Sequence, residues 1–136
     1  MLGNLDAQRD WGYAKDYVEA MWLMMQKSEP SDYVIATGQS HSVREFATMA
    51  FRVAGLAADK YVDSDPGLFR PTEVDLLRGN PAKAVRELGW KPDKTPIQEL
   101  VRIMVEADLE RVNSEIEAGR HTRAAIAARF ISPHRE

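Results

Sequence analysis

The feature that most constrains the fold is the shortage of strand-forming sequence between four well-marked helices. Only "YVIATG", residues 33–38, is a β-branched run bounded by turn residues, which is typical of a short buried strand. "KYVDSD" (60–65) and "VDLLRGN" (74–80) are weaker strand candidates. The sequence therefore predicts an α/β fold that is helix-rich, with a few short strands that cannot make a self-sufficient sheet. We expect such a chain to be part of something larger.

The first predicted helix spans residues 12–27 and carries an apolar stripe. Asp10 precedes it as a candidate N-cap, because short polar side chains accept hydrogen bonds from the first helical N–H groups. Asp16 and Tyr17 are predicted to be structural. The stripe recurs at helical spacing, so we expect it to pack in the core. Its members are Val18, Met21, Trp22 and Met25.

The other three helices are marked by their boundary residues. Ser42 and Glu45 form an S-x-x-E capping box, and Gly55 is a plausible stop for the helix that follows. "NP" at 80–81 and "TP" at 95–96 are typical of an N-cap followed by proline at the first helical position. The third helix is expected to end at Gly89, with Trp90 packing beneath it, and the fourth to end near residue 118.

Composition narrows the classes of function. The chain has 136 residues, which suits one domain, and a net charge of −3, which gives nucleic acid no general foothold. It contains no cysteine, and its three histidines show no ligand spacing, so we expect no metal site. No apolar run is long enough to span a membrane and no signal peptide is recognisable, so we expect no membrane partner and a cytoplasmic location.

The last 18 residues differ in charge from the rest. Residues 119–136 contain four arginines and one glutamate, whereas the preceding residues are net acidic. We predict a main lobe over residues 1–118 and a basic C-terminal tail over 119–136, which we expect to be disordered. The alternative is that this tail contacts an acidic surface or a polyanion.

The chain shows no recognisable catalytic constellation. It has no G-x-G-x-x-G fingerprint between a strand and a helix, and no P-loop. No tyrosine is followed four residues later by lysine, the pair that short-chain dehydrogenases use. We therefore expect no catalytic residue and no cofactor-binding residue in this chain.

"RPTE", residues 70–73, places an arginine and a glutamate in a loop. The planar guanidinium of Arg70 suits the oxygens of a diphosphate, and the carboxylate of Glu73 suits ribose hydroxyls or the N–H edge of guanine. Pro71 restricts the backbone between them. The alternative is that Arg70 and Glu73 pair with each other or with neighbours, as surface ions often do.

Three long stretches resemble one enzyme family. "LGNLDAQRDWGYAKDYVEAMW" (2–22), "YVIATGQSHSVREF" (33–46) and "RPTEVDLLRGNPAKAVRELGWKP" (70–92) are similar, in this order, to the GDP-mannose 4,6-dehydratases. The resemblance implies the C-terminal, substrate-binding part of an extended short-chain dehydrogenase fold, with residues 1–118 as the sugar-nucleotide-binding lobe. In that family an N-terminal Rossmann half binds NADP, GDP-mannose is converted to GDP-4-keto-6-deoxymannose, and the enzymes form homo-oligomers.

The resemblance also implies site residues. Arg70 and Glu73 match nucleotide-binding positions of the family, and Arg9 in "RDWG" matches a third. Arg9 and Arg70 are then expected to hold the diphosphate, and Glu73 the ribose or guanine. Two other functions remain open. The chain could be a non-catalytic nucleotide-sugar binding module, or an interaction protein whose exposed apolar surface drives self-association.

Overall fold

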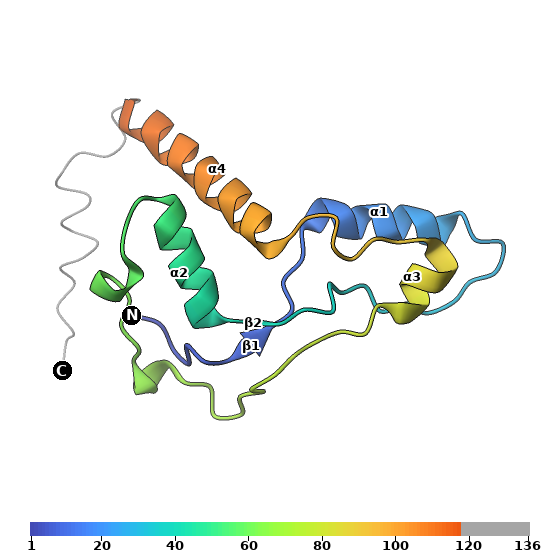
Figure 1. Ribbon diagram of the computed structural model, residues 1–136, viewed down its shortest axis with the longest axis horizontal. Helices are drawn as coiled ribbons and strands as arrows, with labels where there is room; N and C mark the ends of the chain where they lie inside the picture. The colour runs from blue at the N-terminus through green and yellow to red at the C-terminus, as the bar shows by residue number, and fades with distance from the viewer. Residues whose placement is uncertain (118–136) are drawn as a thin grey trace. The chain divides into compact units, whose positions relative to one another are not determined.

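The structure is a computed structural model that describes residues 1–117 (Figure 1). The chain divides into two compact units, Met1–Arg102 and the residues from Ile103 onward, and each is described by itself. The predicted tail over 119–136 lies outside the described residues. The predicted boundary at residue 118 stays a prediction.

The four predicted helices are all present. They are α1 (Ala14–Met25), α2 (Val43–Val53), α3 (Ala82–Leu88) and α4 (Ile97–Glu117). Two short 3-10 helices, η1 (Ala58–Lys60) and η2 (Pro66–Leu68), lie between α2 and α3. No helix within residues 1–117 is both long and apolar enough to cross a bilayer.

Local boundary signals explain where the helices begin and end. Both hydrogen bonds of the Ser42–Glu45 capping box are made at the start of α2. Gly89 follows α3 with φ of +66°, the left-handed conformation that glycine adopts without strain. Asn80 accepts from the Ala82 N–H at the start of α3, at 3.0 Å. The capping box and the stop at Gly89 are confirmed. The prediction of Asn80 as N-cap and Pro81 as first helical residue is wrong by one position, because Pro81 is the N-cap of α3.

The sheet is smaller than the sequence suggests. It consists of β1 (Gln8–Arg9) and β2 (His41–Ser42), which pair antiparallel with Gln8 opposite Ser42 and Arg9 opposite His41. In Figure 1 these strands lie between α2 and the pair formed by α1 and α3.

The prediction of strands at three segments is wrong. Residues 33–38 belong to no ladder, and 60–65 and 74–80 each contribute one isolated bridge, at Ser64 and Leu76. The physical reason is that a strand needs a partner backbone. Within residues 1–117, none of the backbone groups of residues 33–36 makes a backbone hydrogen bond. The α/β class is retained, in a helix-rich form.

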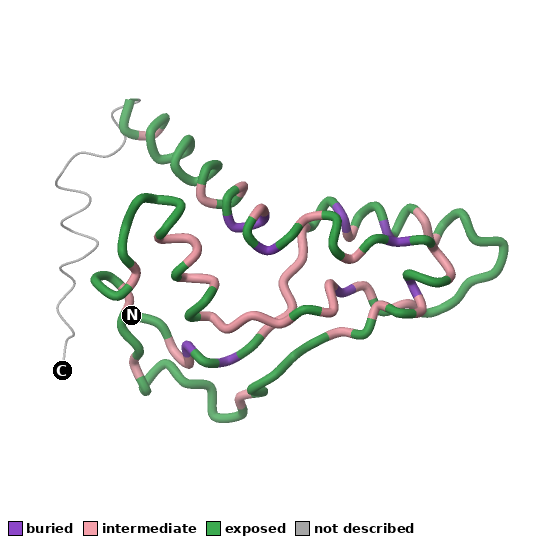
Figure 2. The backbone as a smooth tube through the Cα atoms, viewed as in Figure 1, coloured by how far each residue is buried: buried purple, intermediate pink, exposed green. Residues whose placement is uncertain are grey.

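The core of the first unit lies between α1 and α3. Ala20, Ala84 and Trp90 are buried together, with Tyr17 and Leu88 packed against them. Trp90 is 3% exposed and donates its indole N–H to the Asp16 carbonyl at 3.1 Å. The prediction that Trp90 packs beneath the short helix is confirmed, and Figure 2 shows how few segments are buried.

The apolar stripe of α1 is not part of this core. Val18, Met21 and Trp22 are each about 60% exposed, and Met25 is 82% exposed. The buried positions of α1 are Asp16 and Ala20, because α1 turns its small-residue side toward α3. The prediction that the stripe packs in the core is therefore wrong for this chain.

Candidate functional site

The segment from Arg70 to Gly79 is attached to β1. The Gln8 N–H donates to the Asp75 carbonyl at 2.7 Å, and the Leu77 N–H donates to the Gln8 carbonyl at 3.1 Å. These bonds make the single parallel bridge between Gln8 and Leu76. Residues 75–77 follow the loop that carries Arg70 and Glu73. Their backbone is hydrogen-bonded to β1, the strand that also carries Arg9.

Arg9 fastens the middle of this segment through its side chain. Its Nη1 donates to the carbonyls of Gln8 and Val74, both at 2.7 Å. Its Nη2 makes an ion pair and hydrogen bond with Glu73 Oε1. The Arg9 and Glu73 side chains are 23% and 20% exposed, so the pair is shielded from solvent far more than a typical surface pair.

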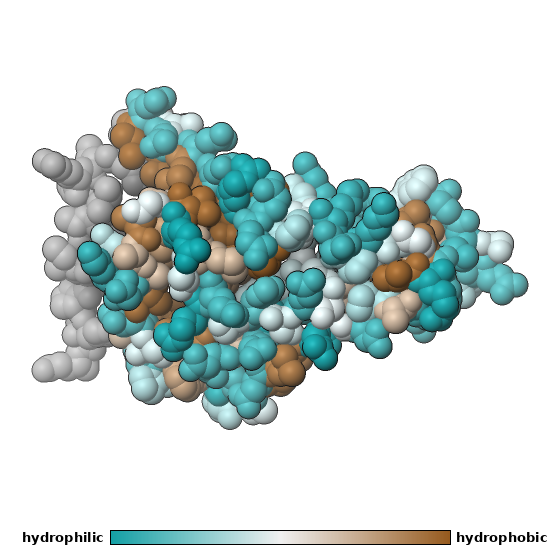
Figure 3. All heavy atoms as spheres, viewed as in Figure 1, coloured by the Kyte–Doolittle hydropathy of each residue, from teal (hydrophilic) through white to brown (hydrophobic). Residues whose placement is uncertain are grey.

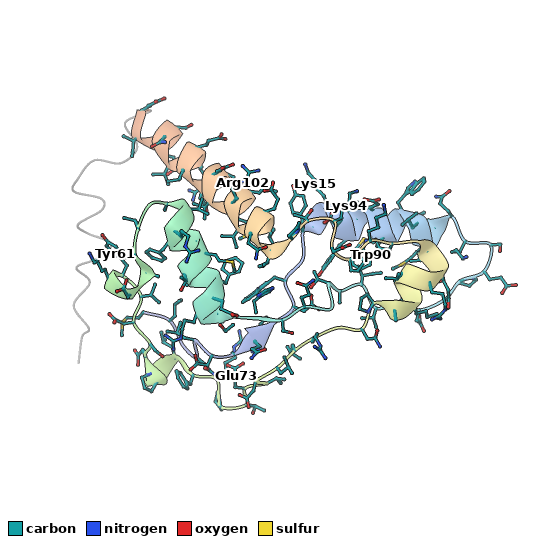
Figure 4. The ribbon with its side chains drawn as sticks, viewed as in Figure 1. Lys15, Tyr61, Glu73, Trp90, Lys94 and Arg102 are labelled. Atoms are coloured by element: carbon teal, nitrogen blue, oxygen red, sulfur yellow. The ribbon has the colours of Figure 1, made fainter. Side chains whose placement is uncertain are left out.

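Two of the three predicted site residues are therefore brought together by the fold. Glu73 lies on the loop beside β1, as Figure 4 shows, although it is 64 residues from Arg9 in the sequence. One carboxylate oxygen of Glu73 is engaged by Arg9. The second oxygen, Oε2, has no partner among residues 1–117.

Arg70 is placed differently. It is exposed, and it makes no hydrogen bond or ion pair with the part of the chain that the structure describes. Glu73 pairs with Arg9 and not with Arg70. The sequence left open that Arg70 and Glu73 pair with each other or with neighbouring residues. Glu73 pairs with a spatial neighbour, Arg9, and the Arg70 guanidinium remains available to an anion.

The prediction that Asp10 is the N-cap of α1 is wrong. The N-cap position is Tyr13, and no side chain caps it. The Asp10 carboxylate instead accepts hydrogen bonds from Thr37, Gly38 and Gly79, in two loops distant in sequence. Sequence reasoning missed this role because an aspartate just before a predicted helix has an ordinary local explanation as an N-cap.

Asp16 and Tyr17 support the same region from α1. The Tyr17 ring lies over Gly12, where a Cβ atom would be 2.3 Å from the tyrosine oxygen. Burial, followed by the nearby carboxylates of Asp10 and Asp16, raises the pKa of Tyr17 above its ordinary value. Tyr17 is thus a neutral packing group beneath the start of α1, as the sequence predicted.

One cavity includes Thr37, a partner of Asp10, in its lining. It measures about 200 Å³, and its other lining residues are Trp11, Gln39, His41, Pro92, Asp93 and residues 95–98. Arg9, Arg70 and Glu73 do not line it. Arg9 and Glu73 lie together in a partly exposed position, and Arg70 is exposed three residues before Glu73 on the same loop. Among residues 1–117 no cluster of His, Asp or Glu could hold a metal ion.

The backbone of this chain is similar to part of a larger solved structure. A solved structure of RMD from Pseudomonas aeruginosa, complexed with NADPH, matches with a TM-score of 0.68 at 24% identity. The match covers 77% of this chain and 34% of that one. At this identity the match supports the fold alone.

Sequence comparison identifies the family. The family model described as GDP-mannose 4,6 dehydratase matches residues 1–104. GDP-mannose 4,6 dehydratase 1 of Arabidopsis thaliana is 53% identical over 84% of this chain, and the human GDP-mannose 4,6 dehydratase is 50% identical over 80%. This chain belongs to the GDP-mannose 4,6-dehydratase family. It spans about a third of the length of these relatives, 31% and 34% respectively.

Proposed function

We propose that this chain is the GDP-sugar-binding part of a GDP-mannose 4,6-dehydratase, the lyase that converts GDP-mannose to GDP-4-keto-6-deoxymannose. The observation that carries the proposal is the Arg9–Glu73 pair, together with Arg70, which is exposed three residues before Glu73 and has no partner among residues 1–117. These residue types, so placed, suit a nucleoside diphosphate. By itself the chain is expected to bind and not to catalyse.

The proposed contacts follow from which polar atoms are still available. Arg70 offers a complete guanidinium fork to the diphosphate. Arg9 has used three of its five N–H groups on Gln8, Val74 and Glu73, which leaves two for the same diphosphate. Glu73 Oε2 is available to a ribose hydroxyl or to the N–H edge of guanine. Arg9 therefore serves both as ligand contact and as support for Glu73.

NADP is proposed to bind outside this chain. None of the eight glycines stands in the spacing of a dinucleotide fingerprint, so the residues present do not fit the cofactor. A Rossmann half, the part that binds NADP in this family, would supply the cofactor and the catalytic groups. Homo-oligomer formation and a cytoplasmic location also remain proposals.

The exposed face of α1 is the surface we propose for the Rossmann half. Val18, Met21, Trp22 and Met25 form a contiguous apolar stripe, and Figure 3 shows apolar surface at the end of the view where α1 and α3 lie. Exposed apolar patches of this kind mark interaction sites. Residues 33–36, packed near this core with no backbone partners, suit addition to the edge of another sheet.

Two readings compete with this proposal. A non-catalytic binding module would use the same three residues but would need no Rossmann half. An interaction remnant would use the α1 face and would not require Arg70. The two experiments below separate these functions, since one measures the ligand and the other measures the partner.

Arg70→Ala is expected to abolish most GDP-mannose binding. Removing one charge-assisted contact to a phosphate costs about 1.5–3 kcal/mol, which is a loss of tenfold or more in affinity. The measurement is ligand-detected NMR with GDP-mannose, beside UDP-glucose as the control for the base. Arg78→Ala is the matched control variant, because Arg78 is exposed on the same segment and has no proposed contact. Equal binding by wild type and Arg70→Ala would refute the assignment.

Trp22→Glu is expected to weaken binding of the Rossmann half by tenfold or more, because it places a charge in the centre of an apolar contact. The measurement is titration of the chain with the separately produced dinucleotide-binding part of the Arabidopsis relative. Leu56→Glu is the control, since Leu56 is 46% exposed just beyond α2, away from α1. If both variants bind as wild type does, the α1 face is not the docking surface.

A further inference from the structure

Asp10 holds two loops with one carboxylate. Its Oδ1 accepts from the Thr37 N–H at 2.9 Å and from Thr37 Oγ1 at 2.6 Å. Its Oδ2 accepts from the N–H groups of Gly38, at 2.9 Å, and Gly79, at 3.2 Å. Four donors from neutral groups thus meet a partly buried carboxylate, and both of its oxygens are used.

The Gly79 contact matters because Gly79 ends the segment that begins at Arg70. Along this segment Arg9 holds Glu73 and Val74, and Gln8 holds the backbone on either side of Leu76. Ser40 Oγ donates to the Leu77 carbonyl at 3.0 Å, and Asp10 holds the last residue. The consecutive residues Gln8, Arg9 and Asp10 therefore fasten the segment from its middle to its end.

Arg9 and Asp10 act on different parts of the segment. Successive side chains of an extended strand point to opposite sides, so two neighbouring residues can reach two separate groups of partners. Arg9 meets Glu73, whereas Asp10 meets the loop end and residues 37–38. Loss of the Asp10 contacts would free the segment's end and allow Glu73 to shift relative to Arg9.

We propose that Asp10 is a positioning residue for nucleotide binding, which fixes residues 70–79 against β1 so that Arg70 and Glu73 meet one ligand together. The inference rests on the proposed function of Arg9, Arg70 and Glu73. It assigns Asp10 no contact with the ligand. If Asp10 only held residues 37–38 in place, its loss would not affect nucleotide binding. The positioning role requires that its contact with Gly79 influences Arg70 and Glu73, several residues away.

The test combines affinity with local exchange. Asp10→Ala is expected to reduce GDP affinity at least fivefold, measured by calorimetric titration, and to speed amide hydrogen exchange within residues 70–79. Ser42→Ala is the matched control, since it removes the α2 cap and lowers stability without touching the segment. It should leave GDP affinity unchanged. If Asp10→Ala does not fold, Asp10→Asn serves, because its single oxygen can satisfy only one of the two groups of donors.

A double variant separates positioning from general destabilisation. If Asp10 acts through the ligand contacts of Arg70, then Asp10→Ala should cost little further affinity in an Arg70→Ala background. Full additivity, or unchanged affinity in Asp10→Ala alone, overturns the positioning role and leaves the proposed function standing. A wild-type chain that is folded and does not bind GDP overturns both.

Discussion

Replacing Trp90 with alanine is expected to lower the free energy of unfolding by about 3–5 kcal/mol, the range for large aromatic side chains removed from a core. Trp90 is 3% exposed and joins the two other buried members of its cluster, Ala20 and Ala84. Its ring packs edge to face against the Tyr17 ring, with centroids 6.0 Å apart, and its indole N–H donates to the Asp16 carbonyl. Removing the indole would leave a cavity in this cluster, between α1 and α3.

The measurement for Trp90 is urea unfolding followed by circular dichroism. Trp22→Ala is the control, because Trp22 is 60% exposed and a surface change of this kind usually shifts stability by no more than about 0.5 kcal/mol. Since domains are stable by only about 5–15 kcal/mol, Trp90→Ala could leave the chain largely unfolded. Similar unfolding midpoints for the two variants would contradict the core described between α1 and α3.

Gly79→Ala is expected to destabilise the fold by about 1–3 kcal/mol, the cost of overpacking a close contact. A Cβ atom at Gly79 would lie 2.2 Å from Ala36 Cβ and 3.4 Å from Val34 Cγ1. A Cβ–Cβ approach of that length is impossible, so the backbone must move. The movement would also lengthen the hydrogen bond from the Gly79 N–H to Asp10.

A second substitution tests the cause of this effect. Ala36→Gly removes the atom that the new methyl would meet, so the Gly79→Ala, Ala36→Gly double variant should recover part of the lost stability. Ala36→Gly alone is measured beside it, because it loses a buried methyl of its own. Urea unfolding of the four proteins completes the cycle. Strict additivity would show that the contact between residues 36 and 79 is not what makes glycine necessary.

The helices were predictable because their signals are local. Ser42 and Glu45 are three residues apart, and Gly89 stops α3 by its own backbone conformation. The predicted starts and ends agree with the structure to within a few residues. The site residues stay predictions, and they have another origin. Arg9, Arg70 and Glu73 were identified by resemblance to a family, and their residue types suit a nucleoside diphosphate.

The sequence by itself determined the four helices, the helix-rich α/β class and the family of this protein. Only the tertiary structure decided that Glu73 pairs with Arg9, that Asp10 joins two loops, and that the α1 stripe faces outward. The physical reason is distance along the chain. Helix caps use neighbouring residues, whereas strand pairing, ion pairs and burial depend on groups tens of residues apart, whose meeting no local pattern specifies.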